Sequence, residues 1–191
     1  MNTVETKSAS LEADSQKNRS IANAWPRLLW LAILVLASLI VSVLLSCATP
    51  FEAIGAAAAV TLARRDALLA SGLTWLINQC VGYGMLGYPW TYNSVAWGLA
   101  LGAATLVATL AAGALYQTRK ALPSLLRSTL AFAAAFLAFE VAIYAVAFFF
   151  LGGLQDFTTG IVSRVLVINA ATFVGLIVIH SLVAQKRVSA G

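Results

Sequence analysis

The sequence contains few of the residues that metal and cofactor sites use. Its 191 residues include a single histidine, His180, and two cysteines, Cys47 and Cys80. One histidine cannot form a cluster for haem or a metal ion, and two cysteines provide neither a zinc motif nor a disulfide framework. No nucleophile stands at a recognisable spacing from a base. The sequence therefore leaves any cofactor unknown and gives little support to a catalytic site.

Charge is equally scarce. Charged residues make up 10% of the chain and hydrophobic residues 61%, and the mean hydropathy is +0.88. This composition lies far from that of soluble proteins and predicts an integral membrane protein whose main partner is the lipid bilayer. In a soluble protein the net charge of +5 would suggest nucleic acid. In a membrane protein, the usual excess of Lys and Arg in cytoplasmic loops explains this net charge, so no nucleic-acid partner is predicted.

The apolar stretches predict an all-α fold, a bundle of six transmembrane helices. Most stretches are about 20 residues long, which matches the hydrocarbon thickness of a bilayer. They are apolar on all sides, whereas the strands of a membrane barrel alternate between apolar and polar residues. The predicted spans are residues 28–47, 51–63, 67–88, 94–116, 128–151 and 161–184. The second is short for a crossing, and we expect it to tilt little, to lie in thinned bilayer or to include residues before Phe51.

The basic residues predict the orientation of this bundle. Of the 12 lysines and arginines, only Arg164 falls on the outer side when both termini are cytoplasmic. We expect a disordered cytoplasmic tail over residues 1–24, a transmembrane domain over 25–185 and a short tail over 186–191. Short loops and a polar N-terminus suit a multi-pass protein of a bacterial inner membrane. An alternative interpretation of Leu44 to Cys47 is a lipoprotein cleavage box.

Polar side chains at similar depth in three spans predict a cavity. Asn78, Glu140 and Asn169 each lie roughly 12 to 17 Å below the outer surface at 1.5 Å per residue. Together they suit an outward-facing cavity for a small organic ligand, with Gln79 and Cys80 adjoining Asn78. Alternatively, the two amides serve only as hydrogen bonds between helices. Glu140 must find a partner or water, because an isolated carboxyl is costly in lipid.

A glycine-rich aromatic segment closes the third span. Gly82, Gly84 and Gly87 precede Pro89, which predicts weakened helix at the outer end. Aromatic residues of this segment suit a lid over an organic ligand, or an aromatic belt at the membrane interface. Arg164, one turn into the sixth span, either extends to the interface or faces inward and holds an anionic group. The candidate ligand-binding residues are Asn78, Gln79, Cys80, Tyr83, Tyr88, Trp90, Glu140, Arg164 and Asn169.

Six helices in 191 residues with an outer binding loop resemble the substrate-binding S components of energy-coupling-factor vitamin transporters. Cys80-Val81 at the start of the aromatic segment is similar to the cobalamin-binding members of that group. The resemblance implies that Cys80 coordinates the cobalt of a corrin. The Ser-Pro expected after Cys-Val is replaced by Gly82-Tyr83.

The sequence is compatible with three functions. The first is a small membrane protein that binds or transports a small molecule through the cavity described above. The second is a structural or assembly subunit that docks against partner chains of a larger membrane complex. The third is a small membrane enzyme that works through Glu140 and Cys80.

Overall fold

The computed structural model describes residues 25–40 and 49–188, which contain helices and connectors but no strand. The chain divides into two compact units, Met1–Ile33 and Leu34–Gly191. A helix over Trp25–Ile40 includes the division between them, and the account below concerns helices of the second unit only. The predicted N-terminal tail, the end of the first predicted span and the Leu44 to Cys47 motif lie outside the described residues.

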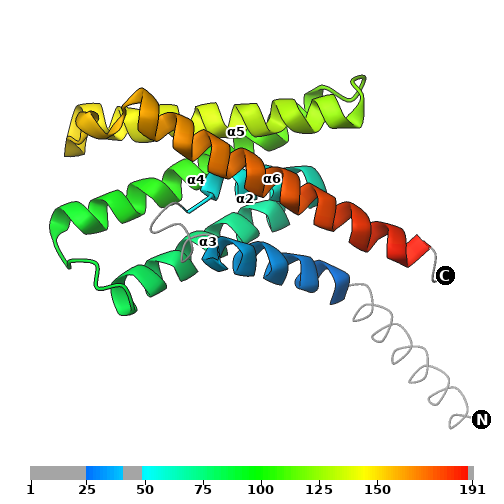
Figure 1. Cartoon of the computed structure of the whole chain (residues 1–191), viewed down its shortest axis with the longest axis horizontal. Coiled ribbons are helices and arrows are strands. Elements are labelled where there is room, and N and C mark those ends of the chain that lie inside the picture. The colour runs from blue at the N-terminus through cyan, green and yellow to red at the C-terminus, as the bar shows by residue number, and fades with distance from the viewer. Residues whose placement is uncertain (1–24, 41–48, 189–191) are drawn as a thin grey trace, which may run out of the picture. The chain divides into compact units, whose positions relative to one another are not determined.

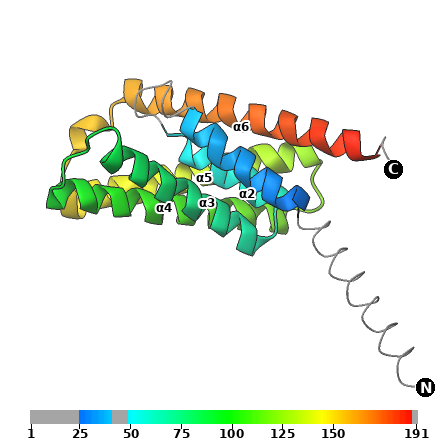
Figure 2. The same cartoon turned by 90° about the horizontal axis from the view of Figure 1, so that it is seen from below.

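The helices of the second unit follow one another in antiparallel fashion. Figure 1 shows the α3–α4 and α5–α6 connectors at one end of these helices and the α2–α3 and α4–α5 connectors at the other. Figure 2 shows the same arrangement after a quarter turn. The elements are α2 (Phe51–Thr61), α3 (Arg64–Gly84), α4 (Tyr92–Thr118), α5 (Ser124–Val146), a π-helical turn (Ala147–Leu151), a 3₁₀ turn (Leu154–Asp156) and α6 (Thr159–Val188).

Three of the described helices are long and apolar enough to cross a membrane. They cover Tyr92–Thr118, Ser124–Leu151 and Thr159–Gln185, in the places of the fourth, fifth and sixth predicted spans. Helix α3 has 21 residues but begins with Arg64, Arg65 and Asp66, which lowers its hydropathy. The all-helical class and the membrane-compatible helices are thus confirmed.

The breaks between helices fall where proline and glycine predict them. Pro123 is the N-cap of α5 and separates it from α4. Helix α3 ends at Gly84, four residues before the predicted end, and Gly87 adopts a φ of +71°. The Leu86 and Tyr88 amides donate to the carbonyls of Val81 and Gly82 at 3.0 Å each. The glycine-rich segment therefore closes α3 with a tight turn, as a left-handed residue after a helix commonly does.

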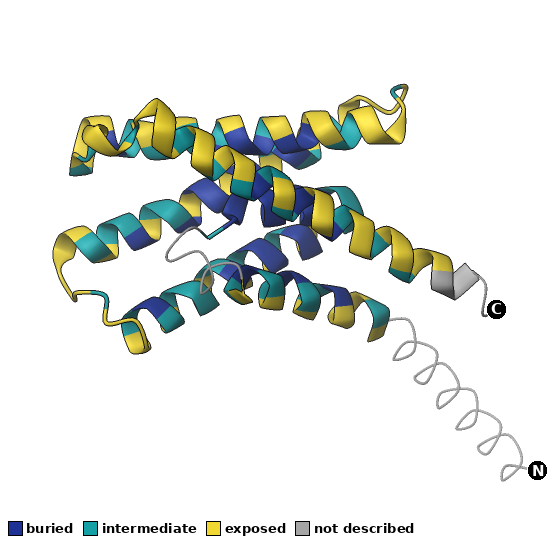
Figure 3. Cartoon of the chain, in the orientation of Figure 1, coloured by how far each residue is buried: buried dark blue, intermediate teal, exposed yellow. Residues whose placement is uncertain are grey.

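Helix α2 is enclosed by protein, which differs from the expectation of a short but ordinary span. It has 11 residues, nine of them buried, and contacts α3, α4, α5 and α6 (Figure 3). At 1.5 Å per residue it is about 16 Å long, roughly half of a hydrocarbon core. Its alanine-rich sequence explains the position, because small side chains allow four helices to approach at once.

Glycines on α4 make room for large side chains of α3. A Cβ on Gly98 would lie 2.7 Å from Gln79 Oε1, and one on Gly102 would lie 2.5 Å from the Trp75 indole. Trp75 Nε1 donates to the Gly98 carbonyl at 2.7 Å. This glycine pair therefore allows close packing of α3 on α4, and the packing fixes the α3 face that carries Gln79.

Candidate functional site

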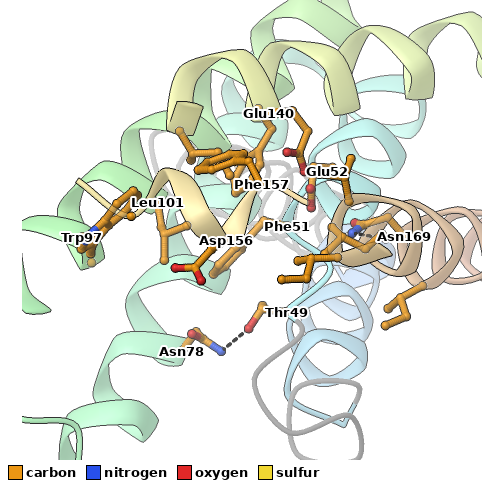
Figure 4. Close-up of a pocket in the computed structure, with 18 of the residues that line it drawn as sticks. Thr49, Phe51, Glu52, Asn78, Trp97, Leu101, Glu140, Asp156, Phe157 and Asn169 are labelled. Carbon is orange, nitrogen blue, oxygen red and sulfur yellow. Dashed lines mark hydrogen bonds between the residues drawn. The ribbon is translucent and has the colours of Figure 1, made fainter. Parts of the chain in front are cut away.

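The α3–α4 and α5–α6 connectors contribute to the wall of a cavity of about 570 Å³. Its walls come from the N-terminus of α2, the second half of α3, the first half of α4, the end of α5 and the start of α6 (Figure 4). This volume falls within the range of small-molecule sites, about 300–1,000 Å³. Six candidate residues line it: Asn78, Gln79, Tyr83, Tyr88, Glu140 and Asn169.

Carboxyl groups give this cavity its charge, and we call it the acidic cavity. Glu52 of α2, Glu140 of α5 and Asp156 of the α5–α6 connector all line it, and no Lys, Arg or His is among the residues that line it. Figure 4 shows the carboxyls of Glu52 and Glu140 on the same side of the cavity. The cavity therefore favours a cationic group over an anionic one.

Glu52 is the most deeply buried of these carboxyls. It is 1% exposed and lies in the first turn of α2. The Asn169 side chain lies next to the carboxyl. Its Oε1 atom has no hydrogen-bond partner among the described residues. A buried oxygen without a partner is costly, so this atom has the capacity to bind a further group.

Asn169 anchors the N-terminus of α2. Its Oδ1 accepts a hydrogen bond from the Ala53 amide at 3.0 Å, and its Nδ2 donates to the Val165 carbonyl at 3.1 Å. Pro50 precedes α2 and provides no side-chain cap. The Asn169 side chain, which is distant in sequence, therefore takes the place of a local N-cap residue. Asn169 thus positions Glu52, and its own amide is occupied by protein partners.

Asn78 has a similar role on the other side of the cavity. Its Nδ2 donates to Thr49 Oγ1 at 3.0 Å (Figure 4), which joins α3 to the segment that enters α2. Both asparagines therefore hold helices together, and both also line the cavity.

Aromatic side chains supply much of the remaining wall. Tyr83, Tyr88 and Trp97 line the cavity near the α3–α4 connector. The Tyr83 hydroxyl is 3.0 Å from Ser94 Oγ, and its ring meets the Tyr88 ring edge-on with centroids 5.8 Å apart. Phe51, Phe139 and Phe157 also line the cavity.

Three candidate residues do not line the acidic cavity. Cys80 is exposed on α3. Successive residues of a helix are turned by about 100°, so the face that carries Asn78 and Gln79 turns Cys80 away. Arg164 is also exposed, because Val165 and Asn169 of the same helix occupy the cavity face. Trp90 is 79% exposed and its ring packs against Tyr83 with centroids 4.6 Å apart.

These positions differ from two expectations. The inward-facing alternative for Arg164 is wrong in this structure, and the cavity carries no cation that would hold an anionic ligand. The role of Cys80 as a cobalt ligand requires it to face the ligand, and its side chain lies outside the acidic cavity.

Sequence reasoning missed Glu52 and the place of Asp156 in the wall. Glu52 follows Pro50 and opens an alanine-rich run that looks like a membrane span. Its one sequence signal is a carboxyl in the first turn of an otherwise apolar helix, a position that the helix dipole favours. Asp156 lies in a connector, whose folding towards the cavity depends on the turn at Gly152 and Gly153, both with positive φ.

A second cavity, of about 420 Å³, lies at the opposite end of α2. Ala59 and Leu62 from that end contribute to its wall, together with Arg64 of α3 and Gln117 and Thr118 of α4. Helix α2 therefore contributes to both cavities, through its first residues to one and its last residues to the other.

In the described part of the chain, no three His, Cys, Asp or Glu residues lie close enough together to hold a metal ion. The three carboxyls of the acidic cavity thus do not form a chelating cluster. Comparisons with protein-family models, with curated proteins and with solved structures find no match for this chain.

Proposed function

We propose that this protein is a membrane protein that binds a small organic ligand in the acidic cavity and transports it or delivers it for transport. The observation that carries the proposal is the cavity itself. It has a volume of about 570 Å³, aromatic walls and a few convergent polar groups, which is the usual composition of a small-molecule site.

The distribution of charge supports an outward-facing position for this cavity. The α2–α3 and α4–α5 ends of the helices carry Arg64, Arg65, Arg119 and Lys120, whereas the connectors near the cavity carry no Lys or Arg. Basic residues concentrate on the cytoplasmic side of membrane proteins. The acidic cavity then faces outward from an inner membrane, with the C-terminal tail in the cytoplasm.

The test is whether the protein retains a small molecule in this cavity. Native mass spectrometry after gentle purification should show a 20.1 kDa chain with a bound small molecule. Leu101→Trp adds bulk to a residue of the cavity wall and should abolish retention. Leu99→Trp is the matched control, because Leu99 is 60% exposed on the same helix and should retain the ligand.

Other outcomes contradict the proposal. A partner chain that co-purifies without a small molecule would favour a structural or assembly subunit. Conversion of the retained molecule, abolished by Glu140→Gln, would favour a membrane enzyme. Equal retention by Leu101→Trp and by the unchanged protein would place the ligand outside the acidic cavity.

A further inference from the structure

We propose that the ligand of the acidic cavity is an organic cation, an amine or quaternary ammonium with an apolar or aromatic body, and that Glu52 is its counter-charge. This inference rests on the proposed ligand-binding function and names the chemical class of the ligand. Three features of the cavity support it: the sign of its charge, the unpartnered Glu52 oxygen and the aromatic walls.

The first feature is the sign of the charge. The wall contains three carboxyl side chains, Glu52, Glu140 and Asp156, and no Lys, Arg or His. A buried carboxylate is stable only when a cation or hydrogen-bond donors compensate for its lost hydration. No basic side chain of the wall supplies that charge, and Glu52 Oε1 accepts no hydrogen bond from the described residues, so the group that compensates this oxygen enters from outside, as a ligand or as a proton.

The second feature is the geometry of Glu52. Its side chain is buried and belongs to the wall. Asn169, which accepts a hydrogen bond from the next residue's amide at Ala53, lies next to the carboxyl, while Oε1 has no partner among the described residues. The start of α2 also favours negative charge at this position through the helix dipole. The carboxyl is therefore fixed in place with one oxygen ready to accept a hydrogen bond or an ion pair.

The third feature is the aromatic wall. Phe51 is the neighbour of Glu52 in sequence, and its ring lies 6.3 Å from that of Phe139, centroid to centroid. Tyr83, Tyr88 and Trp97 line the side of the cavity nearer the α3–α4 connector. The faces of such rings attract ammonium groups, and the attraction grows when water is excluded. An aromatic wall next to a carboxyl suits an alkylated ammonium better than a hydrated inorganic ion.

A chelated metal ion fits this cavity less well. The described residues contain no group of three possible metal ligands close together, and divalent ions such as Ca²⁺ require six or more oxygen ligands. An ammonium group needs only one or two carboxylate oxygens, and its body would fill the apolar remainder of the cavity.

The experiment compares three probes of similar size on the purified full-length protein in lipid nanodiscs. Benzyltrimethylammonium carries a permanent positive charge, neopentylbenzene is its neutral isostere, and phenylacetate is negative. Titration calorimetry should show saturable 1:1 binding of the cation, and binding of the other two should be weaker by about tenfold or more. Leu101→Trp should abolish the binding of the cation, which places the probe in the cavity.

Variants of the carboxyls then test the role of Glu52. Glu52→Gln should weaken binding of the cation by about tenfold or more, and Glu140→Gln should weaken it less, because Glu140 is only half-buried. Asp66→Asn is the matched control. It removes one negative charge from a residue that is also buried, at 7% exposure, but lies outside the acidic cavity. The control should leave affinity unchanged.

The outcomes separate the inference from the proposed function. If neopentylbenzene or phenylacetate binds as tightly as the cation, and Leu101→Trp blocks that binding, the cavity binds ligands but the assignment of a cation is wrong. If no probe shows saturable binding and Glu52→Gln raises the unfolding temperature, a proton alone balances Glu52 and the inference is overturned. If Glu52→Gln does not fold, the comparison of probes on the unchanged protein still decides, because equal affinities for benzyltrimethylammonium and neopentylbenzene would overturn the inference.

Discussion

Asn169 Oδ1 and the Ala53 amide are 3.0 Å apart, although 116 residues separate them in the sequence. This contact joins the middle of α6 to the first turn of α2 and replaces the cap that Pro50 does not provide. Because Glu52 immediately precedes Ala53, the same contact fixes the deepest carboxyl of the acidic cavity.

We expect Asn169→Ala to destabilise the protein by about 1–3 kcal/mol, because a buried backbone amide loses its acceptor. The affinity for a ligand of the acidic cavity should also fall in this variant, because α2 loses its contact with α6. Thr172→Ala is the control, because the Thr172 hydroxyl bonds only to the Ile168 carbonyl of the same helix, at 2.8 Å. Thermal unfolding in detergent measures both variants. Equal unfolding temperatures would mean that Asn169 does not anchor α2.

We expect Gly55→Ala to destabilise the protein by about 1–3 kcal/mol through overpacking. The added Cβ would lie 2.7 Å from Thr109 Oγ1. Thr109→Ala in the same chain removes that oxygen and should recover part of the loss, as a double-mutant cycle would report. Gly175→Ala is the control, because nothing lies within 4 Å of its added Cβ. Independent effects of the two substitutions would contradict this contact between α2 and α4.

We expect Asp156 and Lys120 to lie on opposite sides of the membrane. Asp156→Cys and Lys120→Cys, each in a chain with Cys47 and Cys80 changed to Ser, provide one thiol at each end of the helices. A membrane-impermeant thiol reagent added to intact cells should label the first and not the second. Labelling of Lys120→Cys alone would reverse the orientation and place the acidic cavity on the cytoplasmic side.

We expect Cys80→Ser to leave ligand binding unchanged, because the side chain is exposed and lies outside the acidic cavity. Native mass spectrometry of the variant and the unchanged protein makes the comparison. The alternative comes from the resemblance to cobalamin-binding S components. A corrin absorbance that co-purifies with the protein and disappears in Cys80→Ser would support that alternative.

The sequence was sufficient to predict the helical class and most helix boundaries. Long apolar runs and the breaks at Pro123 and Gly84 depend on local chemistry, which a single sequence records directly. Asn78, Glu140 and Asn169, for which the sequence predicts a common depth, all line one cavity. Depth along a helix follows from the rise per residue alone.

The side chains that face the cavity and the position of α2 could not be predicted, because both depend on contacts between distant segments. Whether Cys80 or Gln79 faces the cavity is decided by the rotation of α3, which the packing of Gln79 against Gly98 sets. The position of α2 depends on four neighbouring helices, and its sequence alone looks like a weak span. For the same reason, Glu52 was missed as a buried residue.

The enclosed position of α2 has a consequence for how a ligand could move. A molecule in the acidic cavity meets the first turn of α2, and beyond its last turn lies the second cavity. Helix α2, which is rich in alanine, therefore lies between the two cavities. Movement of a ligand from one cavity to the other would require α2 to move. A protein that only delivers its ligand to another protein would not require this movement. A cross-link between α2 and α4 would distinguish these two functions, because it should stop uptake of the ligand only where transport requires α2 to move.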